Sequence, residues 1–332
     1  MTDERFLVTG GTGCIGSWVV LNLVREGAAV TVLSSRTRLE RLRLVLTEAE
    51  LAGVEIVEGD VVDLAFTEAL ARRSGVTHLV HLAAMQFPFC AADPIAGARV
   101  NVQGTVTMFE LAKRLGIGRL VYASSAAVYG PKTRYAPTVL PPDAELYPTS
   151  HYGVYKVANE QTARVYQAND GISSIGLRPH SAYGPGRDQG VTSRPTVAMI
   201  AAAAGRPYRI DFGGAYQFQY VDDVARAFVA AARSEREGAE VFSLGGPRIG
   251  VDEIVAAIEA QEPWAKGRIT HGEAPLPFPE AFDGAPLDAA LGPQPLTPLA
   301  DGVRMTIEAY RAAIRHGRVD NAFLDRVVGP RE

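Results

Sequence analysis

The sequence is poor in cysteine, in long apolar runs and in clustered positive charge. Its 332 residues include only Cys14 and Cys90, which are too few for a disulfide framework, and neither has the spacing to the six histidines that a metal site needs. We therefore expect no metal centre. No apolar run is long enough to cross a bilayer, and no Lys/Arg cluster alternates with aromatic residues, so membranes and nucleic acids are not expected partners.

The remaining composition is typical of a globular protein. The chain is 47% hydrophobic, which is enough for a large core, and its formal net charge is only −4. Residues 1–5 lead directly into an apolar stretch, without the pattern of a secretory leader. We expect a cytoplasmic protein.

Glycine is concentrated near the N-terminus, between a short apolar stretch and a longer one. Residues 5–9 read as a buried strand, residues 18–24 read as a helix, and Gly10, Gly13 and Gly16 lie between them. This strand, turn and helix form the context of a dinucleotide fingerprint, in which glycines let main-chain N–H groups approach a pyrophosphate. The residues predicted to contact the cofactor here are Gly10, Thr12, Gly13, Cys14, Ile15 and Gly16.

Apolar segments alternate with helical ones through the first half of the chain. Residues 30–33, 54–57, 78–82 and 119–123 read as strands, which predicts an α/β fold with a doubly wound parallel sheet of the Rossmann type. Ligands of such sheets bind at the carboxyl ends of the strands. Because the composition changes after residue 178, we expect a dinucleotide-binding domain over 1–178 and a smaller substrate lobe over 179–332, with segments that return to the core.

Tyr152 and Lys156 lie four residues apart, so one helical turn would set both side chains on one face. A neighbouring ammonium stabilises a phenolate, and we expect Lys156 to lower the pKa of Tyr152 toward neutrality. The alternative is an exposed helix on which the two residues fall four apart by chance.

These motifs together resemble those of the extended short-chain dehydrogenase/reductase family, in its epimerase and dehydratase branch. The resemblance rests on Thr9-Gly10-x-x-Gly13-x-x-Gly16 and on Tyr152-x-x-x-Lys156. Residues 124–130, 177–186 and 220–225 also resemble family segments. The resemblance implies that Lys156 holds the nicotinamide ribose, that Tyr152 exchanges a proton with the reacting oxygen and that Ser125 hydrogen-bonds that oxygen.

The resemblance also implies further cofactor contacts along the strand ends. These predicted contacts are Ser34, Ser35, Arg36, Asp60, Val61, Leu82, Ala83, Ala84, Asn101, Pro179 and Ser181. NAD-preferring folds usually present a carboxylate after the second strand, whereas this chain has Ser34 followed by Arg36. We therefore expect NADP to be preferred over NAD, unless Arg36 simply points into solvent.

Departures from the family pattern narrow the expected reaction. Ala126 and Ala127 replace the acidic residues of dehydratases and decarboxylases, which leaves an epimerase or a simple dehydrogenase. Ser181 and Tyr216 stand where nucleotide-sugar enzymes of the family have an asparagine and an arginine that bind the diphosphate. We therefore expect a sugar-like substrate without a nucleotide diphosphate. The residues predicted on the substrate side are Met85, Gln86, Phe87, Ser125, Tyr129, His180, Arg187 and Tyr216.

Three interpretations stay open at this point. The first is an NADP-linked or NAD-linked epimerase or dehydrogenase, the second a UDP-sugar 4-epimerase with altered diphosphate contacts, and the third a catalytically silent sensor of dinucleotides. His180 reads either as a second proton donor or as a satisfied core histidine, and Arg187 as an anion-binding or a solvated residue. The resemblance further implies a homodimer, formed by the helix that begins near Ala98 and the helix of Tyr152.

Overall fold

The computed structural model describes residues 3–136 and 138–330 and contains one large central sheet. Seven strands lie in the order β11-β7-β5-β4-β1-β2-β3, and every pairing between them is parallel. This confirms the predicted α/β class. The strands are β1 (Arg5–Thr9), β2 (Ala29–Ser34), β3 (Glu55–Glu58), β4 (His78–His81), β5 (Arg119–Ala123), β7 (Ser173–Arg178) and β11 (Ala239–Ser243).

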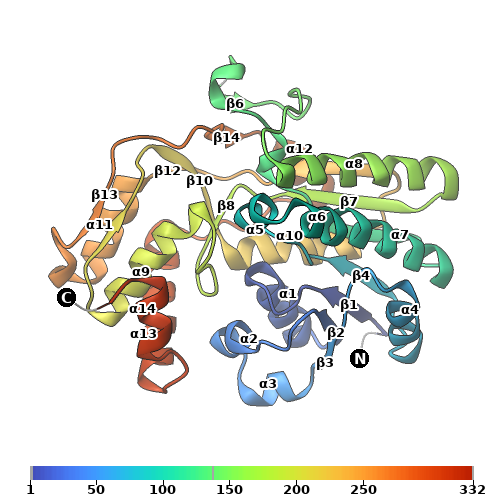
Figure 1. The fold of residues 1–332 in the computed structure, drawn as a ribbon, viewed down its shortest axis with the longest axis horizontal. Helices are drawn as coiled ribbons and strands as arrows, with labels where there is room; N and C mark the ends of the chain where they lie inside the picture. The colour runs from blue at the N-terminus through green and yellow to red at the C-terminus, as the bar shows by residue number, and fades with distance from the viewer. Residues whose placement is uncertain (1–2, 137, 331–332) are drawn as a thin grey trace.

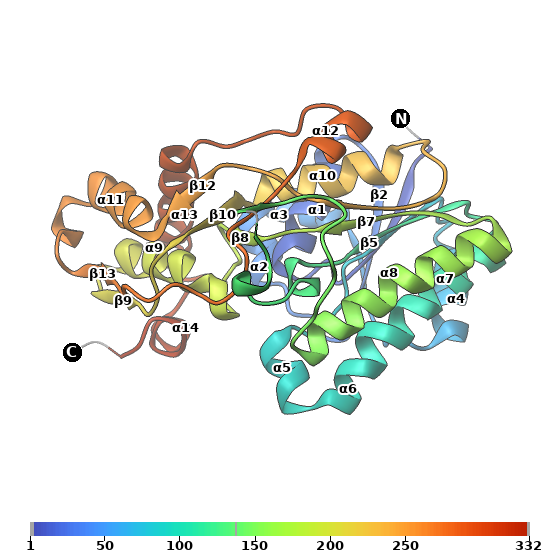
Figure 2. The same cartoon turned by 90° about the horizontal axis from the view of Figure 1, so that it is seen from above.

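Two layers of helices cover the two faces of this sheet, as Figure 2 shows from above. Helix α1 packs closely on α10, while α7 packs on both α4 and α8. Because both faces are covered, the strands are apolar along most of their length, and all six residues of β7 are buried. The helices concerned are α1 (Cys14–Arg25), α10 (Val221–Arg233), α4 (Leu64–Arg73), α7 (Gly104–Leu115) and α8 (His151–Asp170).

The shorter helices lie around these layers. Helices α2 and α3 contact α1, and α5 and α6 contact α8. A π-helical turn, η1, joins α6 to α7. These elements are α2 (Glu40–Val45), α3 (Glu48–Ala52), α5 (Phe87–Ala92), α6 (Pro94–Ala98), η1 (Arg99–Gln103) and α12 (Ala285–Leu291).

The later part of the chain builds a second cluster beside the sheet, at the left of Figure 1. A small sheet in the order β12-β10-β8 is accompanied by two short strand pairs, β13 with β9 and β14 with β6. The strands are β8 (Ser181–Tyr183), β10 (Ala215–Tyr220), β12 (Arg248–Gly250), β9 (Tyr208–Ile210), β13 (Ile269–His271), β6 (Val139–Leu140) and β14 (Ala281–Phe282). The helices are α9 (Arg194–Ala204), α11 (Val251–Gln261), α13 (Leu299–Arg315) and α14 (Asn321–Val327).

Segments of this later part also complete the central layers. Strand β11 pairs with β7 at the edge of the large sheet, and α10 packs against α1. The division of the chain into units at residue 178 stays a prediction. Among the helices of residues 3–136 and 138–330, none combines the length and the apolar character needed to span a bilayer.

Two buried glutamines on β10 connect the second cluster to its surroundings. The side chain of Gln217 accepts from the Phe282 N–H at 2.8 Å and donates to the Phe282 carbonyl at 2.9 Å. Gln219 accepts from the His180 N–H at 2.9 Å and donates to the Leu244 carbonyl at 2.6 Å. Since buried amides need such partners, these bonds fix where β8 and β14 lie relative to β10.

Candidate functional site

The turn after β1 is a cradle that only glycine fits. Gly10 has φ +71°, and a Cβ there would lie 2.7 Å from the Ala83 nitrogen. A Cβ on Gly16 would lie 2.2 Å from the Gly10 carbonyl oxygen. The backbone of the turn therefore lies directly against the end of β4 and the start of α1, which leaves its outer side for a ligand.

Helix α1 begins at this turn without a capping side chain. Its N-cap is Gly13, and no side chain accepts a hydrogen bond from the first turn. The first N–H groups of a helix carry partial positive charge and need acceptors, so the helix begins as an anion site. The glycine cradle and the uncapped helix together fit a dinucleotide pyrophosphate at Cys14, Ile15 and Gly16.

Thr12 and Ser34 lie side by side at the end of β2. Their hydroxyl oxygens are 2.8 Å apart, while Ser35 and Arg36 are exposed. A carboxylate is nearby on β3, because Glu58 accepts from the Thr37 N–H at 3.0 Å and from its hydroxyl at 2.8 Å. These bonds lower the pKa of Glu58, and the charge of Arg36 adds to the effect.

The other predicted cofactor residues line the ends of β3 and β4. The Leu82 N–H donates to the Thr9 carbonyl at 3.0 Å, and the Ala83 N–H to the Thr9 hydroxyl at 3.3 Å. Asp60 forms an ion pair with Arg99 at 2.6 Å. Val61 is buried, and Ala84 is half-buried beside Ala83.

Asn101 lies in the π-helical turn η1 rather than capping a helix. Its amide nitrogen donates to the Gly97 carbonyl at 3.0 Å and to the Met85 carbonyl at 3.2 Å. Its buried Oδ1 atom has no hydrogen-bond partner among the described residues. A π-helical turn with an unsatisfied buried oxygen is typical of a functional position.

Helix α8 carries the predicted catalytic pair. The hydroxyl of Ser150 caps the helix by accepting from the Gly153 N–H at 3.1 Å. One turn separates Tyr152 from Lys156, and the Lys156 Nζ atom lies 5.5 Å from the centre of the Tyr152 ring. Ser125, at the end of β5, hydrogen-bonds the Tyr152 side chain, so all three predicted residues meet.

The pKa of Tyr152 differs from the expectation. Burial raises the pKa of this phenol, although the hydrogen bond with Ser125 and the charge of Arg187 act to lower it. The prediction that Lys156 lowers the pKa of Tyr152 toward neutrality is wrong for this structure. The reason is that burial of the phenol has the largest effect on its pKa, while the Lys156 ammonium donates to the Ala123 carbonyl at 2.6 Å. Burial also lowers the pKa of Lys156 itself, to about 8.

The sequence did not reveal a buried ion pair between Glu160 and Arg178, which lies next to these residues. Glu160 forms two hydrogen bonds with Arg178, at 2.7 and 2.6 Å, and accepts from the Ser124 hydroxyl at 2.5 Å. Ser124 is thereby used structurally, which leaves Ser125 as the serine that faces Tyr152. The spacing could have placed Glu160 on the helix face of Tyr152 and Lys156, because the three residues repeat at four-residue intervals, but no local spacing indicates its pairing with Arg178.

The predicted substrate side is largely aromatic and closed. The rings of Tyr216, Phe278 and Phe282 pack around His180, with ring centres 6.2, 5.8 and 4.9 Å from it. Tyr216 is wholly buried, and its hydroxyl donates to the Gly213 carbonyl at 3.2 Å. Tyr129 is also buried, and its hydroxyl accepts from Arg178 at 2.7 Å. Neither tyrosine presents a free hydroxyl.

His180 is held as a neutral ring. Its Nε2 atom lies 2.8 Å from the Pro279 carbonyl, which can only accept, so Nε2 carries the proton. Its Nδ1 atom then accepts from the buried Ser181 hydroxyl at 3.0 Å. Burial lowers the pKa of His180 to about 4. These bonds favour the satisfied core histidine over a proton donor, and Pro179 just before it is buried.

Arg187 lies in the loop that follows β8, across from α5. Its terminal nitrogen donates to the Thr192 hydroxyl at 3.1 Å, and its buried Nε atom has no partner among the described residues. Gln86 contacts the same loop near Gly190, whereas Met85 is half-buried and Phe87 exposed. The charge of Arg187 acts on both Tyr152 and Cys14, so this guanidinium lies between the catalytic and the glycine-turn regions.

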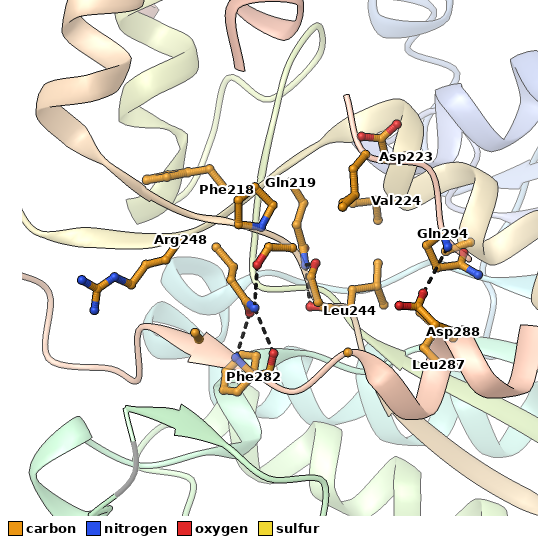
Figure 3. Close-up of a pocket in the computed structure, with 18 of the residues that line it drawn as sticks. Phe218, Gln219, Asp223, Val224, Leu244, Arg248, Phe282, Leu287, Asp288 and Gln294 are labelled. Carbon is orange, nitrogen blue, oxygen red and sulfur yellow. Dashed lines mark hydrogen bonds between the residues drawn. The ribbon is translucent and has the colours of Figure 1, made fainter. Parts of the chain in front are cut away.

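A cavity of about 540 Å³ lies beside β10, and Figure 3 shows it. Gln219, Asp223, Leu244, Phe282 and Asp288 are among the residues that line it. None of Ser125, Tyr152 or Lys156 does so. The catalytic candidates therefore belong to the strand ends of the central sheet and not to this cavity.

A parallel sheet with a glycine cradle and an adjoining Tyr-x-x-x-Lys helix defines a dinucleotide-dependent enzyme of the Rossmann type. Residues 6–245 match the model of the NAD dependent epimerase/dehydratase family. The chain belongs to this family, which confirms the resemblance seen in the sequence.

Individual relatives agree with the family. A UDP-glucose 4-epimerase from Mycolicibacterium smegmatis is 32% identical over 323 residues, which cover 92% of this chain and 98% of that protein. A Thermotoga maritima UDP-glucose 4-epimerase solved with UDP-glucose has a TM-score of 0.80 at 23% identity, covering 94% of this chain and all (100%) of that one. The Thermus thermophilus UDP-glucose 4-epimerase in complex with NAD has a TM-score of 0.76 at 25% identity, covering 93% and 100%.

Proposed function

We propose that the protein is a nicotinamide-dependent epimerase or dehydrogenase that transfers hydride at a secondary alcohol or ketone carbon of a sugar-like substrate. The observation that carries this proposal is the meeting of Ser125, Tyr152 and Lys156 at the carboxyl ends of the parallel strands, the same edge of the sheet at which the glycine turn and the uncapped start of α1 follow β1. These side chains come from two different elements, and a structural role alone does not require a phenol, an ammonium and a hydroxyl at one strand end.

Each residue has a definite task in this proposal. A bound nicotinamide ring supplies the hydride acceptor or donor. Burial raises the pKa of Tyr152, so at neutral pH the phenol holds a proton that it can donate to a carbonyl oxygen in the direction of reduction. In the direction of oxidation the Tyr152 phenolate takes the proton of the alcohol as hydride leaves the carbon. Ser125 hydrogen-bonds the same oxygen as charge develops there, and Lys156 holds the ribose hydroxyls.

The surrounding residues favour redox chemistry without a second acid. Ala126 and Ala127 follow Ser125 directly, and His180 is neutral and tied to the Pro279 carbonyl. Elimination of water from a sugar needs a further acid or base, and these positions offer none. Epimerisation through a transient ketone and simple dehydrogenation both stay within reach of the three residues.

An assay with two readouts tests the proposal. Purified protein is mixed with NAD or NADP and with a panel of aldoses, ketoses and sugar acids, and nicotinamide absorbance is followed together with the NMR spectrum of the sugar. We expect absorbance change for a dehydrogenase or a new epimer without net change for an epimerase. If neither appears for any substrate while dinucleotide still binds, the silent-sensor interpretation replaces the enzyme.

A second candidate is a UDP-sugar 4-epimerase, which the relatives favour by their names. Against it stand the buried Tyr216 and the aromatic packing around His180, which provide no cation for a diphosphate. Arg187 is the charged residue best placed to compensate, because its Nε atom lacks a partner among the described residues. UDP-glucose in the same assay distinguishes the candidates, since tight binding and conversion to its 4-epimer are expected only from the second.

We further infer that NADP binds more tightly than NAD. Supporting this are the Thr12 and Ser34 hydroxyls at the end of β2 and the exposed Arg36, whose charge also acts on Glu58. Replacing Ser34→Asp should weaken NADP binding by about tenfold or more, because a carboxylate repels the 2′-phosphate. Equal affinities for NAD and NADP in the unchanged protein would contradict the inference.

We also propose a homodimer built on α8 and the η1 and α7 helices. Val154 and Val165 are 48% and 56% exposed, and their spacing of three turns places them on one face of α8. Light scattering should give twice the mass of one chain, and a V154E/V165E variant should give one. A monomer for the unchanged protein at micromolar concentration would contradict the proposal.

A further inference from the structure

Glu160 is a wholly buried carboxylate one helical turn beyond Lys156. It accepts from Ser124, which directly precedes Ser125 at the end of β5, and from two nitrogens of Arg178 on β7. A single side chain thus ties the helix of Tyr152 and Lys156 to the ends of two neighbouring strands. No other side chain of α8 in the described structure bonds both strands.

Arg178 extends this connection on its far side. It is itself buried, and its third nitrogen donates to the Tyr129 hydroxyl at 2.7 Å. Burying an ion pair costs much of what the attraction returns, so such a pair is a poor way to gain stability alone. Its place at the junction of α8, β5 and β7 suggests a role in the geometry of the site.

The surroundings of Lys156 give Glu160 a second role. The groups that face the ammonium are the Ala123 carbonyl on β5, the Tyr152 ring and Glu160 on α8, Cys90 on α5 and His81 on β4. His81 is neutral, since burial lowers its pKa to about 3. Burial also raises the pKa of Cys90, so its thiol stays protonated near neutral pH. Glu160 is then the one anionic side chain among the groups that act on Lys156.

We propose that Glu160 is a positioning residue for the reaction: through Ser124 and Arg178 it holds the Lys156 helix against the strand ends, and its carboxylate provides the negative charge that the buried Lys156 ammonium faces. The inference rests on the proposed function, in which a protonated Lys156 holds the ribose. It predicts that Glu160 changes how Lys156 titrates and not merely how stable the fold is.

The chain itself makes a direct test feasible, because it contains only four lysines, Lys113, Lys132, Lys156 and Lys266. Protein labelled with ¹³C at the lysine Cε atoms is titrated by NMR, and the Lys156 signal is assigned with a Lys156→Met variant. In the unchanged protein we expect a midpoint at about 8. In Glu160→Gln the midpoint should fall by roughly half a unit to one unit.

A control ion pair separates this effect from lost stability. Arg206, just after α9, is buried and paired at 2.6 Å with Asp325 on α14. Asp325→Asn should lower the melting temperature and leave the Lys156 midpoint unchanged. If Glu160→Gln does not fold, the Glu160→Met/Arg178→Met double variant removes both charges with side chains of suitable size. A smaller fall in the same direction is expected, because the Arg178 cation is removed as well.

The outcomes for the inference and for the proposed function are distinct. A Lys156 midpoint that is equal in the unchanged protein and in the folded Glu160 variant overturns the inference, whether or not any substrate is known. Once a substrate is found, the alkaline limb of kcat should move to lower pH in the variant by the same amount as the NMR midpoint. Absence of turnover with every substrate defeats the proposed function and leaves the NMR result to decide the role of Glu160.

Discussion

The glycine turn and the aromatic cluster around His180 are built by different means. The turn depends on main-chain atoms, since Gly10 and Gly16 lie so close to neighbouring backbone that no Cβ fits. The aromatic cluster depends on the rings of His180 just before β8, of Tyr216 on β10 and of Phe278 and Phe282, which come from three separate parts of the sequence. A site made from backbone keeps its ligand class as long as the glycines remain, whereas a site made from side chains can change its ligand.

The two regions also differ in charge. At the glycine turn, the uncapped start of α1 favours an anion. In the aromatic cluster, His180 is neutral and the Tyr216 hydroxyl donates to the Gly213 carbonyl. We therefore expect the cofactor side to be general for the family and the substrate side to be particular to this protein, and substitutions can test that contrast.

The largest effect is expected from Tyr152→Phe. Without the phenolic proton, kcat should fall by roughly 10² to 10⁴-fold while dinucleotide affinity stays within about twofold. Tyr155→Phe is the matched control, because Tyr155 lies on the same helix as Tyr152 and its hydroxyl donates to the Pro94 carbonyl on α6, at 2.8 Å. This variant should leave turnover unchanged. Equal activities for both variants would remove Tyr152 from the chemistry.

Gly16→Ala should show the next largest effect, on the cofactor side alone. The added Cβ would lie 2.2 Å from the Gly10 carbonyl oxygen and would push the turn away from the pyrophosphate. We expect dinucleotide affinity, followed by nicotinamide fluorescence, to drop about 100-fold, as for misplacements of an ångström. Gly118→Ala is the control, because its Cβ would meet no atom within 4 Å. Unchanged affinity in Gly16→Ala would break the comparison between the two regions.

Lys156→Met should lower turnover and raise the free energy of unfolding, and the rise should depend on pH. Burial lowers the folded-state pKa of Lys156 from its ordinary 10.5 to about 8, so below pH 8 the folded protein bears the full cost of a buried ammonium. Between these two values the unfolded chain binds more protons, and this cost disappears as pH rises. The variant should therefore be more stable by on the order of 1–3 kcal/mol near neutral pH, and the gain should vanish by about pH 10.5. Urea unfolding at several pH values measures it, and a gain that grows with pH would contradict the assignment.

Tyr216→Phe should have the smallest effect. Its hydroxyl lies in the aromatic cluster and bonds only backbone, donating to Gly213 and accepting from Leu276. Losing these bonds should cost about 1 kcal/mol of unfolding free energy and leave substrate KM within roughly twofold. A large rise in KM would instead show that the Tyr216 hydroxyl contacts the substrate directly.

The sequence predicted the elements that repeat at short range. Spacing alone located the glycine turn, five strands of the central sheet and the meeting of Tyr152 with Lys156, because each depends on neighbours within one turn or one strand. The pKa of Tyr152 was not predictable in this way. It depends on how deeply α8 is covered and on the Ala123 carbonyl that takes the Lys156 ammonium, and only tertiary packing sets these.

Long-range pairings account for what the sequence did not reveal. Glu160 and Arg178 lie on different elements, and nothing local in the sequence links them. The burial of Tyr129 and Tyr216 likewise follows from contacts with Arg178 and with residues near 276, not from their own strands. Burial of large polar side chains is decided by the assembled layers, so sequence spacing identified these residues without their roles.

The glycine turn and the Tyr152–Lys156 helix should form one site across the strand ends. A crystal structure with bound NADP would show whether they do. We predict the pyrophosphate at the N–H groups of Cys14 and Ile15, the nicotinamide ribose hydroxyls within hydrogen-bond distance of the Lys156 Nζ atom, and the nicotinamide ring facing the Tyr152 hydroxyl. A dinucleotide bound elsewhere, or with its ribose turned away from Lys156, would contradict the account.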